Sequence, residues 1–406
     1  MTRSRLHVTQ RLRALLSYRK FAGPAPRILI LRGDYWLDDA CARAAHAMGW
    51  EVNTVPIAAE GHLSREAVAG FLKALAFFRP DFALSINLAG MDDQGLFARL
   101  FEDLEIPYVV WFADNPRTIT MGSDAYSSSY SVAFTWDRSY TPYLSSIGFP
   151  AVHYLPLAVD PALFNAAPRE SWPLPPAFVG NSNTASSIAE RSWLQAHSPG
   201  LVDALDFALD AGQVNRERFA EGLAAMIDPA LCATLGPHER RHGELYLFCE
   251  ATRRERRALV QELVPEGLVV YGDAGWRSIL ESAREPVPYG PELMRHYGAC
   301  EINLNSTSSQ MPMAVNQRVF DCPAAGGFLL TDAQEAVAEL FEPEREAICY
   351  HSFDECADKL RFYRRTPVAR LAVVRKAHKR IMSEHTYAHR LRKIADLVKN
   401  QLGSPI

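Results

Sequence analysis

An arginine and an acid three positions apart, Arg318 and Asp321, carry the clearest chemistry in this sequence. On a helix, that spacing puts both side chains on one face. An arginine can neutralise a diphosphate leaving group without a metal ion, and a carboxylate near a strand end can accept two hydrogen bonds from ribose hydroxyls. Residue types of this kind suit a ligand-binding site, and the elements around them decide whether they can meet.

The segment around this pair, residues 299–332, has the order expected of a βαβ unit. An alternating run at 300–305 predicts a strand and is followed by a Ser/Thr-rich loop, a helix at 316–321, Gly326–Gly327 and a second strand at 328–330. Charged groups then lie near the end of a strand, which is where open α/β folds bind ligands.

Three acids in the first half of the chain also follow predicted strands: Asp34, Asp114 and Asp137. Because parallel strands end at the same edge of a sheet, we expect these acids to converge on one crevice. Asp34 is the first candidate for a base that activates an acceptor hydroxyl, and Asp114 is the second. Helix capping, or orientation of Arg32 and Arg117, is the alternative role for Asp34 and Asp114.

Strands alternate with helices along the chain, which predicts parallel, doubly wound α/β sheets. The predicted strands are residues 27–31, 51–57, 82–87, 107–112, 132–135, 151–155, 177–179, 268–271, 300–305, 328–330 and 347–350. Residues 184–264 and 354–402 read as mainly helical. Polar or glycine turns at Gly180, Gly272 and Gly326–Gly327 would present backbone N–H groups to a diphosphate. Tyr271, Trp276 and Tyr289 are candidates for stacking on a base, with burial in a core as the alternative.

Composition narrows the class of protein. A chain of 406 residues predicts two or three domains, and 48% hydrophobic with 22% charged residues is typical of globular proteins. A net charge of −4 gives no support to nucleic acid as the main partner. Seven cysteines without a C-x-x-C pair favour reduced thiols in a cytoplasmic protein. The sequence contains neither G-x-G-x-x-G nor a Walker A loop, and neither G-x-S-x-G nor H-E-x-x-H.

The N-terminus, residues 1–20, is basic, and its apolar residues are too interrupted for a signal peptide. A basic amphipathic helix favours peripheral contact with an anionic membrane surface, and an ordinary surface helix is the alternative. We expect a cytoplasmic protein, with any membrane contact at the inner face.

Short pieces along most of the chain, from about residue 27 to 395, resemble one family in their order and spacing. They are residues 111–117, 154–161, 178–181 with Arg191, Tyr271–Gly272, 302–305, and 318–321 with Gly326–Gly327. The sequence resembles GT-B glycosyltransferases of the CgeB-like group (spore maturation protein CgeB), with a C-terminal half similar to group 1 glycosyltransferases.

The resemblance implies two Rossmann-like domains that face a central cleft. We expect a basic extension at 1–24, an acceptor domain at 25–170, a nucleotide-sugar donor domain at 171–385, and a final helix at 386–406 that crosses back to the first domain. Asp321 then corresponds to the acid that holds the ribose. The other residues expected around the donor are Gly180, Asn181, Arg191, Tyr271, Gly272, Asn305, Arg318, Gly326 and Gly327.

The predicted activity is a hexosyltransferase-type glycosyltransferase in bacterial glycan biosynthesis. It uses a UDP- or dTDP-sugar in preference to a GDP-sugar, a protein or glycan acceptor, and neither a metal nor another cofactor. Group 1 relatives usually carry an acid eight residues before the ribose-binding one, and here that position is Met313. This departure leaves the sugar contact and the stereochemistry open. The alternatives are a nucleotide-sugar epimerase on the same fold and a non-catalytic glycan-binding or assembly protein with a degenerate donor site.

Overall fold

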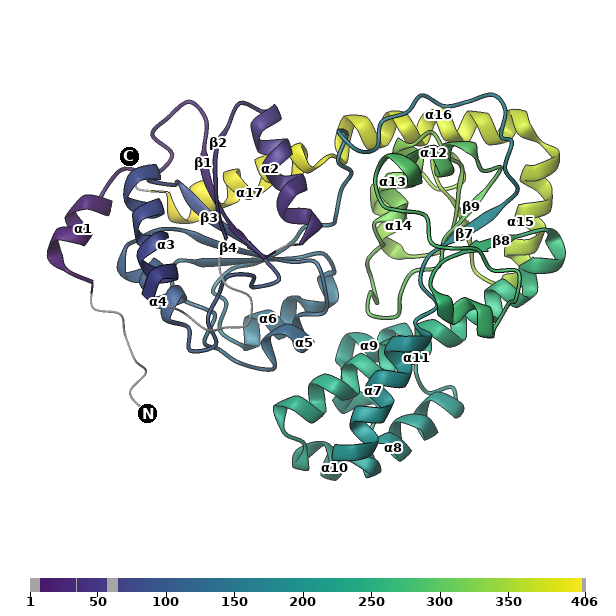
Figure 1. The fold of residues 1–406 in the computed structure, drawn as a ribbon, viewed down its shortest axis with the longest axis horizontal. Helices are drawn as coiled ribbons and strands as arrows, with labels where there is room; N and C mark the ends of the chain where they lie inside the picture. Colours follow the sequence, from purple (N-terminus) through teal and green to yellow (C-terminus); the bar gives the residue numbers. More distant parts are fainter. Residues whose placement is uncertain (1–7, 34, 57–64, 404–406) are drawn as a thin grey trace. The chain divides into compact units, whose positions relative to one another are not determined.

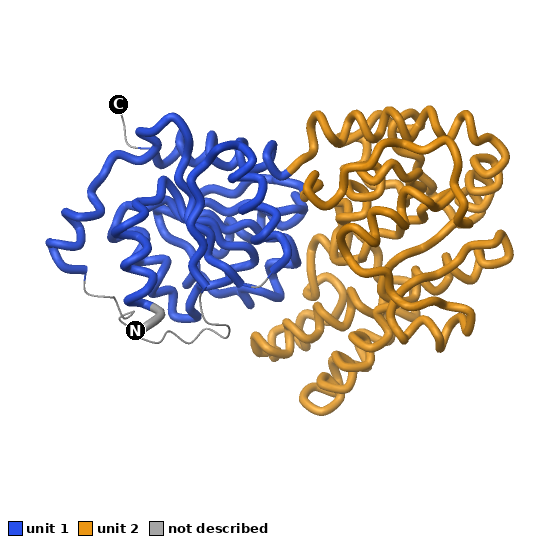
Figure 2. Tube along the Cα trace, turned by 45° about the horizontal axis from the view of Figure 1, so that its top comes forward, with its two compact units in different colours: residues 1–156, 387–406 blue, residues 157–386 orange. Residues whose placement is uncertain are grey.

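The computed structural model describes residues 8–33, 35–56 and 65–403. The chain divides into two compact units, coloured separately in Figure 2. Unit 1 comprises residues 1–156 together with 387–406, and unit 2 comprises residues 157–386. The division after residue 156 precedes the boundary expected at residue 170. The last helix is part of unit 1.

Unit 1 is built on a parallel six-stranded sheet with the order β2-β1-β3-β4-β5-β6 (Figure 1). Its strands are β1 (Arg27–Arg32), β2 (Glu51–Pro56), β3 (Phe82–Ile86), β4 (Tyr108–Phe112), β5 (Ser131–Thr135) and β6 (Val152–Tyr154). The central strands β3, β4 and β5 are buried along their whole length. That burial explains why they read as unbroken apolar runs, because helices cover both faces of a parallel sheet.

The helices of unit 1 alternate with these strands, and the last helix of the chain joins them. They are α1 (Gln10–Leu16), α2 (Trp36–Ala47), α3 (Arg65–Phe78), α4 (Leu96–Asp103), α5 (Pro116–Thr120), η1 (Arg138–Tyr140), α6 (Thr141–Ser146) and α17 (Tyr387–Leu402). Helix α17 packs against α2, and its Tyr387 ring meets Trp36 and Trp111 edge-on. Among the residues described, no helix has the length and apolarity needed to cross a membrane.

Unit 2 contains a parallel five-stranded sheet with the order β11-β10-β9-β7-β8. Its strands are β7 (Ala177–Val179), β8 (Val269–Tyr271), β9 (Asn303–Leu304), β10 (Leu329–Asp332) and β11 (Ile348–Tyr350). Strand β9 is shorter than the run predicted at 300–305. Asn303 and Leu304 pair with β7 and β10, whereas Cys300 bridges to Leu174, outside the named strands.

The helices of unit 2 fall into two groups. Those around the sheet are η3 (Val264–Glu266), η4 (Ala274–Ser278), α12 (Pro291–Ala299), α13 (Arg318–Ala324), α14 (Glu335–Leu340), α15 (Phe353–Arg365) and α16 (Pro367–Glu384). The second group lies between β7 and β8, and we call it the helical insertion (residues 184–263). It contains α7 (Thr184–His197), α8 (Pro199–Asp210), α9 (Arg216–Glu221), η2 (Leu223–Ala225), α10 (Pro229–Thr234) and α11 (Pro237–Leu263).

The helical insertion has its own hydrophobic core. Leu194, Leu205, Phe219 and Leu247 are among its buried members, and this cluster is separate from the one that lines the sheet. Figure 1 shows these helices gathered beside the sheet.

Both sheets have the doubly wound order in which the first strand lies between the second and the third. The predicted fold class, two Rossmann-like α/β sheets, is confirmed. In such sheets ligands bind outside the carboxyl ends of the strands, where the strand order reverses. These positions are β1/β3 in unit 1 and β7/β9 in unit 2.

Candidate active site

The reversal point of unit 2 gathers several of the predicted donor-binding residues. Gly180 and Asn181 follow β7, Asn305 follows β9, and Arg318 is the first residue of α13. Arg318 donates hydrogen bonds to the Val179 carbonyl and to Asn305 Oδ1. The sheet topology thus brings together residues that lie more than a hundred positions apart in sequence.

Gly180 leaves room for this arginine at its present position. A Cβ atom at position 180 would lie 2.8 Å from Arg318 Nη2, closer than real Cβ contacts. The guanidinium carbon of Arg318 also lies 5.1 Å from the centre of the Phe178 ring, within cation–π range. The glycine and the aromatic ring together fix the guanidinium at the end of β7.

A second guanidinium, from Arg256 on α11, reaches the same strand ends. It donates to the Asn181 carbonyl at 2.7 Å and to the Ser306 carbonyl at 3.4 Å. Arg256 is 8% exposed, and burial, with the nearby Arg318 charge, lowers its pKa to about 10. The sequence did not single out this residue.

Arg256 and Arg318, the arginine pair, have backbone carbonyl and amide oxygens as hydrogen-bond partners. In the described part of the chain neither forms an ion pair with a carboxylate, and both have a buried Nε atom without a hydrogen-bond partner. The carboxylates of Glu255 and Asp332 act on Arg256 only from beyond ion-pair distance. Two like charges held close together by neutral oxygens favour an anionic ligand. The arginine pair is therefore a candidate anion site at the position where the fold predicts one.

Polar contacts connect the loops around the arginine pair. Asn305 is fully buried, accepts from Asn316 Nδ2 at 2.8 Å and donates to Thr331 Oγ1 at 2.9 Å. A Cβ atom at Gly272 would lie 2.1 Å from the Gly180 carbonyl oxygen, so glycine permits the close approach of the two loops. Tyr271 packs on His296, and its hydroxyl accepts from Arg284 at 2.9 Å.

Asp321 lies in the first turn of α13 and is 1% exposed. Its carboxyl accepts hydrogen bonds from Gln317 Nε2 at 2.7 Å and from the Tyr289 hydroxyl. Burial raises the pKa of Asp321 to about 8, and the charge of Asp160 adds to that effect. The sequence did not indicate that these two partners cover the acid.

This raised pKa makes a prediction about stability. In the unfolded chain Asp321 regains its ordinary pKa of 3.8. Between pH 3.8 and about pH 8, the folded state therefore carries a proton on Asp321 that the unfolded state has lost. The stabilising contribution of protonated Asp321 is thus complete below the ordinary pKa and is lost as pH rises through about 8. We expect the Tm of wild type to fall relative to that of Asp321→Asn between about pH 5 and about pH 9 in thermal melts.

Asp358→Asn is the matched control for that experiment, because the Asp358 side chain is 74% exposed. Its Tm should follow wild type at every pH. A Tm difference between wild type and Asp321→Asn that stays constant with pH would contradict the assignment.

The remaining predicted donor residues lie elsewhere. Gly326 and Gly327 separate the end of α13 from the start of β10, so they lie at the amino edge of the sheet, opposite the arginine pair. Gly326 has φ +69°, and a Cβ atom at Gly327 would lie 2.7 Å from the Tyr297 carbonyl oxygen. Arg191 is on α7 of the helical insertion and pairs with Asp206 at 2.7 Å. Trp276 is fully buried and donates to the Gly180 carbonyl, so it belongs to the core.

In unit 1, the end of β4 presents Asp114. Its Oδ2 accepts from Asn87 Nδ2 at 2.8 Å and from the Tyr35 hydroxyl at 3.1 Å. These partners follow β3 and β1, so this cluster also sits at a reversal point. Asp137 is buried, and its Oδ1 accepts a hydrogen bond from the Ser139 N–H at 2.8 Å, so it caps η1. Asp34 lies outside the described residues.

No cluster of three or more histidine, cysteine, aspartate or glutamate side chains that could hold a metal occurs among the residues that the structure describes. All seven cysteines are buried and free of disulfides.

Comparison with known proteins agrees with this geometry. Residues 247–396, which include the arginine pair and Asp321, match a family described as glycosyl transferase-like. No match is found among curated proteins.

Similar solved structures align with nearly the whole chain. A sucrose-phosphate synthase from Thermosynechococcus elongatus is 12% identical, covers 94% of this chain and 100% of its own, and has a TM-score of 0.52. A glycosyltransferase from Rickettsia africae ESF-5 is 10% identical over 94% of this chain and 100% of its own, with a TM-score of 0.49. Anabaena HepE in complex with UDP-glucose is 11% identical over 92% of this chain and 100% of its own, with a TM-score of 0.48.

The class follows from the sheet topology and the first of these structures: the chain has the GT-B fold of glycosyltransferases. Within it, residues 247–396 form a glycosyl transferase-like segment of the group 1 type.

Proposed function

We propose that this protein is a glycosyltransferase that moves a sugar from a nucleotide-sugar donor to a protein or glycan acceptor without a metal ion. UDP- and dTDP-sugars are the proposed donors. The narrower CgeB-like assignment rests on the sequence pieces between residues 111 and 327.

The arginine pair carries this proposal. In sugar transfer, negative charge develops on the diphosphate as the glycosidic bond to it breaks. Arg256 and Arg318 supply two guanidiniums that are held by neutral oxygens and are therefore available for that charge. Preorganised cations aimed at developing charge lower the barrier strongly, because they need no reorganisation during the reaction. Together they take the role that a metal ion has in other transferases.

Asp321 is the proposed ribose ligand, on the same helix as Arg318. Its carboxyl already accepts hydrogen bonds from Gln317 and from the hydroxyl of Tyr289, a side chain that is 44% exposed. Ribose hydroxyls are donors of the same kind, and on binding they replace the Tyr289 hydroxyl. Gly180, Asn181, Gly272 and Asn305 line the approach to the diphosphate, and Tyr271 is the proposed contact to the base.

Binding of UDP is the most direct test. A ligand that binds only the native state, at 100 times its Kd, stabilises it by about 2.7 kcal/mol. We expect saturating UDP or dTDP to raise the Tm by about 3 °C or more, and GDP to raise it less. Differential scanning fluorimetry with the three nucleotides measures this.

Incubation with the donor alone separates the remaining activities. A transferase releases free UDP slowly from a UDP-sugar without acceptor, and faster when a suitable acceptor is added. An epimerase would instead produce a second nucleotide sugar. A Tm that no nucleotide changes would contradict the proposal and favour a non-catalytic assembly protein.

A further inference from the structure

The helical insertion is larger than the fold requires. A crossover between two parallel strands needs a single helix, yet residues 184–263 form several helices around a separate core. Between α8, α9 and α11, this insertion forms a half-open cavity of about 240 Å³. Its walls also include Ser309, from the loop that follows β9.

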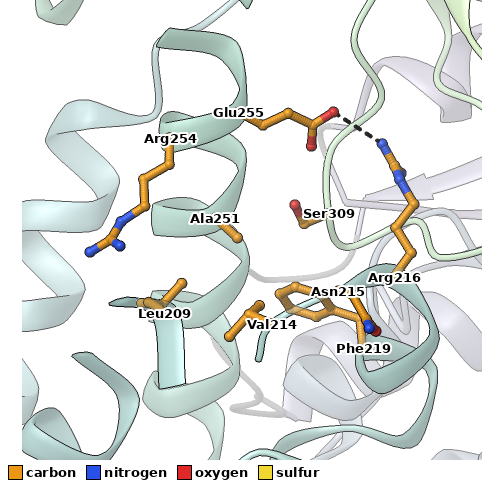
Figure 3. A pocket seen from close by; sticks show the side chains of 9 residues that line it. All are labelled: Leu209, Val214, Asn215, Arg216, Phe219, Ala251, Arg254, Glu255 and Ser309. Atoms are coloured by element: carbon orange, nitrogen blue, oxygen red, sulfur yellow. Dashed lines mark hydrogen bonds and ion pairs between the residues drawn. The ribbon is translucent and has the colours of Figure 1, made fainter. Parts of the chain in front are cut away.

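The cavity has an apolar floor. Leu209 and Phe219 belong to the insertion core, and Val214 and Ala251 pack against it. Figure 3 shows Leu209, Val214 and Phe219 on the side opposite Glu255. The floor is thus an apolar surface that includes one aromatic ring, that of Phe219.

The rim is polar. Asn215, Arg216, Glu255 and Ser309 contribute an amide, a guanidinium, a carboxyl and a hydroxyl. In Figure 3 the Glu255 and Arg216 side chains point toward each other, with the two groups 3.4 Å apart. The Arg216 guanidinium also donates to the Met311 carbonyl and to Asp332, so it orients the Glu255 carboxyl at the rim. The Glu255 carboxyl and the Ser309 hydroxyl are the rim groups that can bond to the hydroxyls of a ligand.

The charges at the cavity are balanced within the protein. Arg216 pairs with Glu255 and with Asp332 at 2.9 Å, and Arg254 pairs with Glu250 and Asp210. Burial also raises the pKa of Glu255, which brings its carboxyl nearer to neutrality. This cavity therefore differs from the arginine pair, which forms no ion pair in the described part of the chain, and it favours a neutral ligand.

The volume of the cavity limits the size of the ligand that it can hold. The volume is far above the ~10–15 Å³ that a single water needs and below the ~300–1,000 Å³ of pockets for drug-sized molecules. One sugar ring presents a C–H face and a ring of hydroxyls, which match an apolar floor and a polar rim. We infer that this cavity is a second carbohydrate site, which binds one neutral monosaccharide unit separately from the nucleotide-sugar site.

The cavity and the arginine pair share the loop after β9. Arg216 donates to the Thr307 carbonyl at 3.2 Å, and the preceding Ser306 carbonyl accepts from Arg256. On α11, Glu255 faces the cavity while its neighbour Arg256 faces the strand ends. The inference does not depend on the proposed function, since the two sites lie on different sides of this loop.

Titration with saccharides tests the inference. Methyl glycosides of glucose, galactose, mannose and N-acetylglucosamine are added to the full chain with UDP present at saturation, and binding is followed by saturation-transfer NMR and calorimetry. We expect at least one glycoside to bind and inorganic phosphate not to compete. Ala251→Trp fills the cavity and should abolish binding, and Glu255→Ala should weaken it about tenfold by removing hydrogen bonds.

Glu262→Ala is the matched control, because Glu262 is exposed on the same helix and does not line the cavity. It should bind the glycoside like wild type. A cooperative thermal melt with a Tm close to that of wild type, measured without ligand, shows that Ala251→Trp and Glu255→Ala are folded. Lack of binding by every glycoside, or equal binding by all variants, overturns the inference even if UDP binds. Glycoside binding that depends on the cavity, in a protein whose Tm UDP does not change, supports the carbohydrate site while the proposed function fails.

Discussion

Replacing Arg318 with alanine is expected to lower kcat/KM for the nucleotide sugar by about 10²- to 10³-fold, as removal of one oxyanion donor does in other enzymes. The same variant should lose most of the UDP-induced rise in Tm. The reason is the position of the guanidinium, which Gly180, Phe178 and Asn305 hold at the reversal point of the sheet. Steady-state kinetics and fluorimetry measure the two effects.

The partner residue and a conservative change sharpen this test. Arg256→Ala should have an effect of similar size, because its guanidinium meets the same strand ends. Arg318→Lys should be intermediate, since lysine keeps the charge but loses the planar fork that binds phosphate oxygens. Arg375→Ala, which removes a 60% exposed arginine from a surface pair, is the control and should behave like wild type. Near-normal kinetics for Arg318→Ala and Arg256→Ala would contradict the role of the arginine pair.

Much of the fold could be predicted from the sequence because parallel sheets leave a strong pattern. Strand β4, Tyr108–Phe112, is apolar at every position and buried at every position. The helix boundaries were also visible where Gly49 and Pro80 end the pattern of α2 and α3.

The role of Arg256 at the site could not be predicted from the sequence. It stands in a run of charged residues, Arg253–Arg257, which is typical of a solvent-exposed helix face. In the structure Arg253 and Arg254 pair with Glu250, whereas Arg256 turns inward to the carbonyls after β7 and β9. Only the packing of α11 against the sheet distinguishes these neighbours.

Gly326 and Gly327 show the reverse case, in which the sequence predicts a donor contact that the structure places elsewhere. In sequence, Gly326–Gly327 resembles a phosphate-binding turn. In the structure these glycines follow the end of α13, and because this helix runs antiparallel to the strands, they lie at the amino edge of the sheet. The positive φ of Gly326 and the crowding at Gly327 explain these glycines by backbone geometry. Arg318 begins the same helix and therefore lies at the opposite, carboxyl edge of the sheet.

Asp114→Asn is expected to lower kcat by about 10²- to 10⁴-fold, the range for loss of a general base, while the KM for the donor changes little. Asp114 is half-buried at the end of β4. The Asn87 amide nitrogen donates to the Asp114 carboxylate, and its amide oxygen accepts from the Ala113 N–H at 2.8 Å. The Asn87 side chain therefore positions both Asp114 and the backbone that follows β4.

The backbone at Asn87 supports a functional role for this cluster. Asn87 and Leu88 both have positive φ angles, of 51° and 62°. Asparagine adopts this conformation readily, whereas at Leu88 it costs about 1–3 kcal/mol, and such strain is found often at functional sites. Here they turn the chain after β3 so that the Asn87 amide faces Asp114.

Asp103→Asn is the control for this variant, because Asp103 forms a surface pair with Arg13 far from the strand ends. Asp34→Asn is measured in parallel, since Asp34 is the first candidate from the sequence. Loss of turnover in Asp34→Asn alone would move the base to that residue. Normal turnover in both variants would mean that neither carboxylate takes the acceptor proton. Loss in Asp114→Asn with unchanged UDP binding is the result expected of a base that acts on the acceptor and not on the donor.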